Sequence, residues 1–395
     1  MTVENEETPM NTEEPLDFKL ELADKWFQCK TPDVPNVDRS ALKKDILETI
    51  LAHNMTPVYE DVCQDLGWDV DNSVLERMKT ANAKTLQELA DKIKDAEENL
   101  GEMEVRDALL AKADYMAEIG DKDAATEAYA ATEAKTAGAG PKMDLAFSLL
   151  RLHIARGDWA AVKEGIERAQ DLFSKGGDWE RKNRLKVYEA VFLTATRQFR
   201  RAAELFLDSV ATFTATELMP FTQCVFYTVA LAVVALDRPT LKEQVIDNPE
   251  VLSVIDSVPY LRSFSESLYN SRYAEFFTAF SGLTDALRSN RIIHPHFRCY
   301  MREARVVAYS QFLESYKSVT MAAMATAFGV HSDFLDGELA DFIVAGRLAA
   351  KIDRVAGTVE TTRPDAKNAA YQSALRQGDQ LLNKLQKLSK VVDIE

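Results

Sequence analysis

The chain has 395 residues, enough for two to four domains or one elongated array of repeats. Its 63 Asp and Glu against 47 Lys and Arg give a formal net charge of −16, which disfavours binding to polyanions such as nucleic acids and anionic membranes. Hydrophobic residues make up 46% of the chain, which excludes a wholly disordered protein, and the low count of 15 glycines favours helices.

The first 17 residues contain six acidic residues and no Lys or Arg. We expect residues 1–18 to form a disordered acidic tail, with partner binding as the alternative. This segment lacks the basic start and the apolar stretch of a signal peptide. The four cysteines lie far apart without CxxC spacing. Neither a disulfide framework nor a zinc cage is therefore expected, and a reducing compartment fits best.

Residues 19–100 are predicted to form N-terminal helices, because apolar residues recur at helical spacing from Leu42 to Leu51. Residues 101–216 contain three recurring turns, spaced 37 and 41 residues apart: Gly120-Asp121, Gly157-Asp158 and Gln198-Phe199. In the first two turns, Gly can end one helix in a left-handed conformation and Asp can cap the next. The third turn lacks the Gly. The spacing predicts a tetratricopeptide-like α-solenoid of helical hairpins.

A cluster of basic residues follows the second hairpin: Arg181, Lys182, Arg184 and Lys186. It is either a contact for an acidic partner or a solvated face of the solenoid. Composition does not distinguish the two.

Residues 217–316 are predicted to form the helical part of a further module. The run Leu218–Leu236 contains 19 uncharged residues and must be weighed as a membrane span. Only Cys224–Leu236 is nearly all apolar, and these 13 residues reach about 20 Å as a helix. Since a bilayer core needs about 30 Å, a buried helix is expected. The closely spaced aromatic residues from Phe264 to Phe280 favour a buried helix stack over a cofactor site.

Residues 317–363 show the order helix, turn, helix, hairpin that is typical of a winged helix. The predicted elements are, in order, a helix at Met321–Phe328 closed by Gly329, a helix capped by Ser332 and ending near Gly346, and strands at Leu348–Asp353 and Thr358–Thr362. The second helix has four acidic residues and no Lys or Arg between His331 and Gly346. A helix that reads DNA needs cationic and amide side chains. We therefore expect docking to protein.

The last segment, residues 364–395, is predicted to be one long helix. Leu381, Leu385, Leu388 and Val392 lie four, three and four residues apart, which forms an apolar seam that Leu382 widens. The seam lasts less than two heptads, too short for a free coiled coil. The helix therefore either folds back on its own chain or joins a bundle with other chains.

No motif for catalysis is complete. The chain has no phosphate-binding loop, no HExxH and no GxSxG. His294 and His296 with nearby Cys299 resemble part of a metalloprotease motif, but the required Ser and Asp positions hold Ala304 and Val307. We predict no catalytic, cofactor-binding or metal-binding residue, no cofactor and no enzyme activity. Carboxylate pairs for acid–base chemistry are not identifiable in so acidic a sequence.

The solenoid followed by a winged helix resembles the PCI family, a scaffold shared by the proteasome lid, the signalosome and a translation-initiation complex. The lid is the most similar of these, through the segments 176–188, 203–208, 212–214, 345–353 and 363–368. The resemblance implies a non-catalytic scaffold subunit of the 26S proteasome lid, in the 19S regulatory particle. Such a subunit is needed for lid assembly and for ATP- and ubiquitin-dependent protein degradation, in cytoplasm and nucleus. The alternatives are a scaffold of the signalosome or the initiation complex and, more remotely, a winged-helix nucleic-acid binder.

The resemblance also implies where partners bind. Other lid subunits would contact the winged-helix strand edges and a C-terminal helical bundle, and the helical arm is a candidate surface for base ATPase subunits. No nucleic acid and no membrane are expected. The predicted partner-binding residues are Leu348, Ala350, Lys351, Ile352, Val359, Leu381, Leu382, Leu385, Leu388 and Val392.

Overall fold

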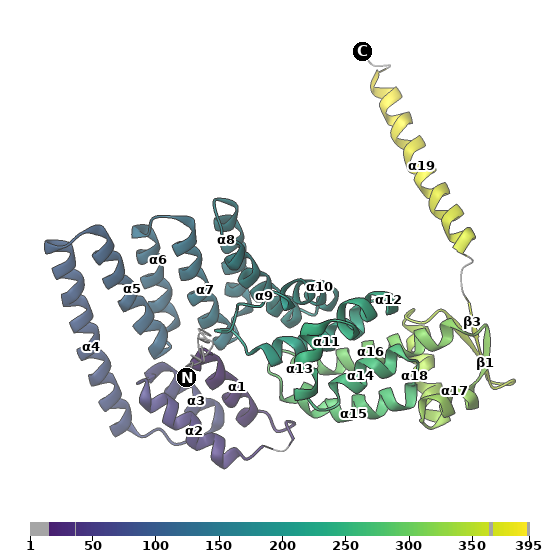
Figure 1. Cartoon of the computed structure of the whole chain (residues 1–395), viewed down its shortest axis with the longest axis horizontal. Coiled ribbons are helices and arrows are strands. Elements are labelled where there is room, and N and C mark those ends of the chain that lie inside the picture. Colours follow the sequence, from purple (N-terminus) through teal and green to yellow (C-terminus); the bar gives the residue numbers. More distant parts are fainter. Residues whose placement is uncertain (1–15, 36, 363–365, 393–395) are drawn as a thin grey trace, which may run out of the picture. The chain divides into compact units, whose positions relative to one another are not determined.

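The computed structural model describes residues 16–35, 37–362 and 366–392 (Figure 1). These residues form many helices and one three-stranded sheet, so the predicted mainly helical fold class is confirmed. The chain divides into two compact units. The first holds the chain up to Asn270 together with Glu275–Glu303, and the second holds Ser271–Ala274 and the chain from Ala304 onward.

The predicted acidic tail, residues 1–18, lies outside the described residues except for its last three. For Asp17 and Phe18 the prediction of disorder is wrong. Asp17 caps the first helix, because its carboxylate accepts a hydrogen bond from the backbone N–H of Lys19 at 3.1 Å. Its own backbone N–H donates to the carbonyl of Glu217 at 3.1 Å. Phe18 is already helical. An acidic residue at this position is therefore structural.

Four N-terminal helices share one apolar core. They are α1 (Phe18–Lys30), α2 (Arg39–Ala52), α3 (Thr56–Leu66) and α4 (Asn72–Asn99). Ile46, Ile50 and Val62 are completely buried in this core, at 0% exposure. Most of the long α4 is exposed or half-buried, as expected for a charged helix with a narrow apolar stripe.

The helical hairpins follow as predicted, and Figure 1 shows α4 to α8 side by side. The hairpin helices are α5 (Glu102–Ile119), α6 (Lys122–Lys135), α7 (Ala139–Arg156), α8 (Trp159–Ser174), α9 (Trp179–Ala195) and α10 (Phe199–Val210). Gly120 and Gly157 adopt φ of +85° and +72°, and Asp121 and Asp158 cap the following helices. At the third turn Arg197 takes the left-handed conformation, with φ +64°. The hairpin geometry is thus kept without the glycine.

Gly120 offers a test of this geometry. A Cβ atom at Gly120 would lie 2.5 Å from Cγ2 of Val58 on α3, whereas a Cβ at Gly157 would meet no atom within 4 Å. Both substitutions to Ala strain a positive φ, by about 1–2 kcal/mol, but only Gly120→Ala also overpacks the interface. We expect Gly120→Ala to lower the free energy of unfolding by about 2 kcal/mol more than Gly157→Ala. Urea unfolding followed by tryptophan fluorescence measures both, and equal losses would contradict the close packing.

The segment between the hairpins and the winged helix contains a nearly all-buried helix. The elements that follow the hairpins are α11 (Phe221–Ala235), α12 (Arg238–Leu241), the π-helical η1 (Lys242–Ile246), α13 (Pro249–Val254), η2 (Ile255–Ser257), α14 (Leu261–Tyr269), α15 (Tyr273–Ser289), η3 (His294–His296) and α16 (Phe297–Glu314). Every residue of α11 from Cys224 to Val233 is buried, as predicted. None of the described helices is long and apolar enough to cross a membrane.

The aromatic cluster of this region is a packed core, as expected. The rings of Phe264, Phe276 and Phe280 stack with centroids 4.9 to 5.7 Å apart. None of the three is more than 3% exposed. Each pair contributes about 0.5–1.5 kcal/mol beyond the burial of its surface.

The second unit contains the winged helix and the last helix. After the part of α16 from Ala304 onward, its elements are β1 (Ser318–Thr320), α17 (Met321–Phe328), α18 (Ser332–Val344), β2 (Ala350–Asp353), β3 (Thr358–Thr361) and α19 (Ala366–Val392). The antiparallel sheet has the order β1-β3-β2, and Val359 of the central strand lies opposite Val319 and Ile352. The predicted winged helix and the predicted long helix are both present.

Three details of the winged helix differ from prediction. His331 caps α18 in place of Ser332, because the imidazole Nδ1 accepts from the backbone N–H of Asp333. Leu348 lies outside the strand, since β2 begins at Ala350. Strand β1 was not predicted, because three residues carry too little alternation to be recognised.

Candidate protein-interaction surfaces

The sheet of the winged helix presents two short edge strands, β1 and β2. Of the predicted contact residues here, Val359 is 0% exposed, and Leu348 and Ala350 are 5% exposed. Their side chains lie in the core of the module and are not available to a partner. Lys351 is exposed and Ile352 is half-buried. The backbone edge of β2, with these two side chains, is therefore what this part of the sheet offers to another strand.

The acidic helix α18 contacts the rest of its own module. The carboxylate of Asp336 pairs with Arg354 at 2.8 Å. Glu338 pairs with Arg305 and accepts a hydrogen bond from the hydroxyl of Tyr309, each at 2.9 Å. Asp336 thus fixes α18 to the β2–β3 hairpin, and Glu338 fixes it to α16.

The outward surface of α18 is apolar and acidic. Phe334 is 49% and Val344 is 89% exposed, and the exposed charged residues of this helix are Asp333 and Asp341. The exposed apolar side chains suit contact with a protein. The carboxylates beside them would repel the phosphates of DNA.

The last helix carries an exposed apolar stripe. Leu381, Leu382, Leu385 and Leu388 are between 52% and 60% exposed. The side chain of the fifth predicted residue, Val392, lies outside the described residues. Since more than half of each leucine faces solvent, the stripe is open to another chain. This arrangement is what joining a helical bundle requires.

The basic cluster on α9 is used within the chain. Arg181 makes a two-pronged ion pair with Asp144, at 2.9 and 2.6 Å. Lys186 lies 3.4 Å from Asp208, and the ammonium of Lys182 lies over the ring of Phe173. Arg184 is partly buried against Glu217, as described next. The cluster is therefore paired within the chain, and contact with an acidic partner stays a prediction.

A buried ionic network joins distant parts of the first unit around Glu217, which is 4% exposed. Its Oε1 accepts hydrogen bonds from the guanidinium of Arg184, at 2.7 and 3.0 Å, and from the hydroxyl of Tyr188, at 3.1 Å. Arg151 lies 3.9 Å from the same oxygen and 3.1 Å from the carboxylate of Asp17. The network therefore ties the start of α1 to α7, α9 and the turn before α11.

The electrostatics of the network favour charged arginines. Burial opposes the charge of Arg184, but Glu217, Tyr188 and Asp144 together outweigh it and raise the arginine pKa. Burial, with the charge of Glu217, raises the pKa of Tyr188, so this hydroxyl stays protonated and donates. The sequence could not reveal these contacts, because the partners are separated by tens of residues or more.

The histidine pair of the incomplete metal motif has structural partners. His296 Nε2 lies 2.6 Å from the carbonyl of Ala195, and its Nδ1 accepts from the guanidinium of Arg197 at 2.9 Å. These contacts hold the third hairpin turn in its left-handed conformation. His294 Nδ1 lies 2.9 Å from the carbonyl of Arg288. In the described residues no group of three or more His, Cys, Asp or Glu is placed to hold a metal ion.

Three family models match the chain. The 26S proteasome subunit RPN7 matches residues 71–244, the PCI domain matches residues 283–363, and the C-terminal helix of the 26S proteasome regulatory subunit RPN7/PSMD6 matches residues 370–392. Relatives align over nearly the whole length. The 26S proteasome non-ATPase regulatory subunit 6 homolog of Arabidopsis thaliana is 52% identical over 375 residues, which cover 95% of this chain and 97% of the relative. The chain belongs to the family of the 26S proteasome regulatory subunit RPN7/PSMD6.

Other members of the regulatory subunit 6 family are also similar to this chain over most of its length. The Oryza sativa protein is 50% identical over 95% of this chain and 96% of its own, and the Dictyostelium discoideum protein is 45% identical over 88% and 91%. The COP9 signalosome complex subunit 1b of Drosophila melanogaster is only 24% identical, over 77% of this chain and 59% of its own length. The predicted resemblance to the proteasome branch of the PCI family is confirmed.

Proposed function

We propose that the chain is a non-catalytic scaffold subunit of the 26S proteasome lid, needed for lid assembly and hence for ATP- and ubiquitin-dependent protein degradation. The exposed leucine stripe of α19 carries this proposal, because this helix matches a C-terminal helix specific to the family and needs a partner to cover it. The structural use of His294 and His296 supports a non-catalytic role.

The proposed partners are other lid subunits. A strand of one such subunit would pair with the edge of β2 at Lys351 and Ile352. Helices of other subunits would pack against the apolar stripe of α19 in a bundle, at Leu381, Leu382, Leu385, Leu388 and Val392. The helical arm is the proposed surface for base ATPase subunits. Cytoplasm and nucleus are the proposed locations. The signalosome role has weaker support, because the signalosome relative is distant.

Depletion in cells tests the proposed function. Switching off the endogenous gene should make ubiquitin conjugates accumulate, since proteasomes without an assembled lid process them poorly. Re-expression of the full chain should restore the normal level. Unchanged conjugate levels after complete depletion, measured by immunoblotting, would refute the proposal.

A further inference from the structure

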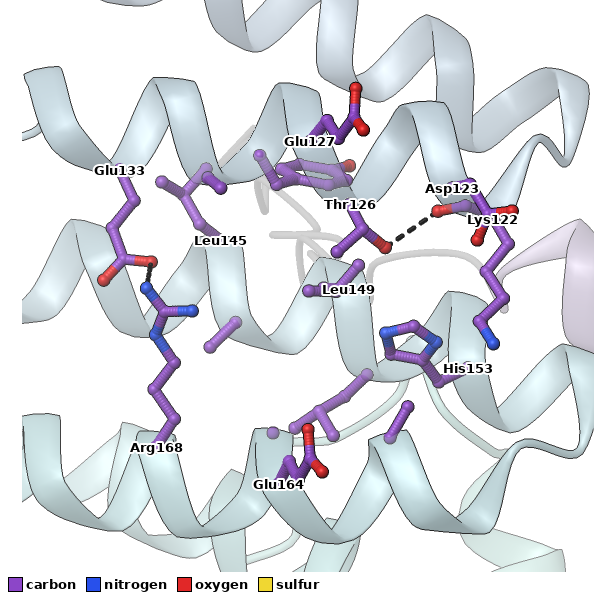
Figure 2. A pocket seen from close by; sticks show the side chains of 16 residues that line it. Lys122, Asp123, Thr126, Glu127, Glu133, Leu145, Leu149, His153, Glu164 and Arg168 are labelled. Carbon is purple, nitrogen blue, oxygen red and sulfur yellow. Dashed lines mark hydrogen bonds and ion pairs between the residues drawn. The ribbon is translucent and has the colours of Figure 1, made fainter.

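A groove of about 650 Å³ lies on the hairpin repeats, on elements other than those proposed to bind lid partners (Figure 2). One face of α7 forms its floor, and α6 and α8 form its two walls. The floor is largely apolar, with Leu145, Ala146, Leu149 and Leu150. Stacked helical hairpins commonly form concave binding surfaces. Here the surface lies between α6 and α8, above α7.

The walls of the groove are acidic. Asp123 and Glu127 on α6 and Glu164 on α8 line it, and all three are exposed. In the described part of the chain these three carboxylates make no ion pair. A fourth carboxylate, Glu133, pairs with Arg168 across one end of the groove, as Figure 2 shows. The groove therefore presents negative charge above an apolar floor.

The floor also contains a polar atom that lacks a partner. His153 is 5% exposed, and its buried Nδ1 makes no hydrogen bond within the described residues. Burial lowers the imidazole pKa, and the nearby Lys122, paired with Asp158, lowers it further, so the ring is neutral near pH 7. A buried polar atom without a partner destabilises the folded chain. A neutral imidazole in the floor does not repel a cationic segment.

We propose that this groove binds a segment of a partner protein that presents Lys or Arg side chains together with an apolar side chain. The cations pair with Glu127 and Glu164, and the apolar side chain covers Leu149. The acidic N-terminus of the chain itself has the wrong charge for this groove. This role is additional to lid scaffolding.

Fluorescence anisotropy with the full-length chain tests the proposal. The probe is a fluorescein-labelled 14-residue peptide of Lys, Leu and Ala. Two control peptides replace every Lys by Glu or every Leu by Gln. We expect the Lys/Leu/Ala peptide to bind, and both control peptides to bind at least about tenfold more weakly.

Matched variants locate the binding. Glu127→Lys with Glu164→Lys should weaken binding about tenfold or more, by reversing two attractions. Glu167→Lys with Asp171→Lys changes the net charge of the chain by the same amount. Both positions lie on α8 but outside the groove, so this variant should leave Kd nearly unchanged. Ala146→Trp should fill the floor and weaken binding without any change of charge. Circular dichroism verifies that each variant is folded.

Several results would overturn the proposal. Equal weakening by both charge pairs would indicate diffuse attraction to an acidic protein. Equal binding of the Glu/Leu/Ala peptide would indicate unspecific apolar contact, and no binding of the Lys/Leu/Ala peptide at millimolar concentration would exclude the site. Because α19 itself carries five Lys and Arg against one Asp, a dimer seen by sedimentation and dissociated by the groove variant would assign the groove to a second copy.

Discussion

Replacing Glu217 by Ala should destabilise the first unit by about 3–5 kcal/mol, since it leaves the guanidinium of Arg184 partly buried without its carboxylate. The buried hydroxyl of Tyr188 loses its acceptor at the same time. The loss should exceed that of an average surface substitution several-fold.

The measurement is urea unfolding followed by tryptophan fluorescence, because all four tryptophans lie in the first unit. Glu204→Ala is the matched control. Glu204 is exposed and pairs with Arg200 at 3.7 Å within one helix, so its loss should cost less than about 0.5 kcal/mol. If Glu217→Ala were as mild as Glu204→Ala, the network would not stabilise the fold.

Replacing Leu381, Leu385 and Leu388 together by Asp should abolish incorporation into the lid. Each leucine is more than half exposed in the described chain, so the substitutions remove little internal packing. In a bundle the same positions would be buried, where three carboxylates cost several kcal/mol each. Native gels of cell extracts, probed for the tagged chain, measure the incorporated fraction.

A matched control separates the stripe from charge alone. Gln372→Asp, Gln380→Asp and Asn383→Asp add the same three charges to the side of α19 that faces away from the stripe. This variant should assemble normally. Incorporation of the leucine variant at the normal level, or equal failure of both variants, would show that the stripe does not make the bundle contact.

Much of the fold follows from local sequence patterns. Gly120 and Gly157 end helices in the left-handed conformation, which glycine adopts without strain. Asp121 and Asp158 cap the helices that follow. The leucines of α19 were predictable as a stripe because helical spacing puts them on one face. Such features depend on neighbours in sequence.

Features that depend on distant partners were not predictable. Arg184 appeared to be part of a free basic cluster, and only the fold brings Glu217 against it. Arg197 adopts φ +64° with its side chain bound to His296, 99 residues away. Leu348, Ala350 and Val359 were predicted as contact residues, and their burial depends on the packing of the sheet on its helices.

Affinity purification of the tagged full-length chain from cells, with quantitative mass spectrometry of the co-purifying proteins, tests the central claim most directly. We expect the subunits of the proteasome lid in near-equal amounts with the chain. Recovery of signalosome or initiation-complex subunits in their place, or of the chain alone, would contradict it.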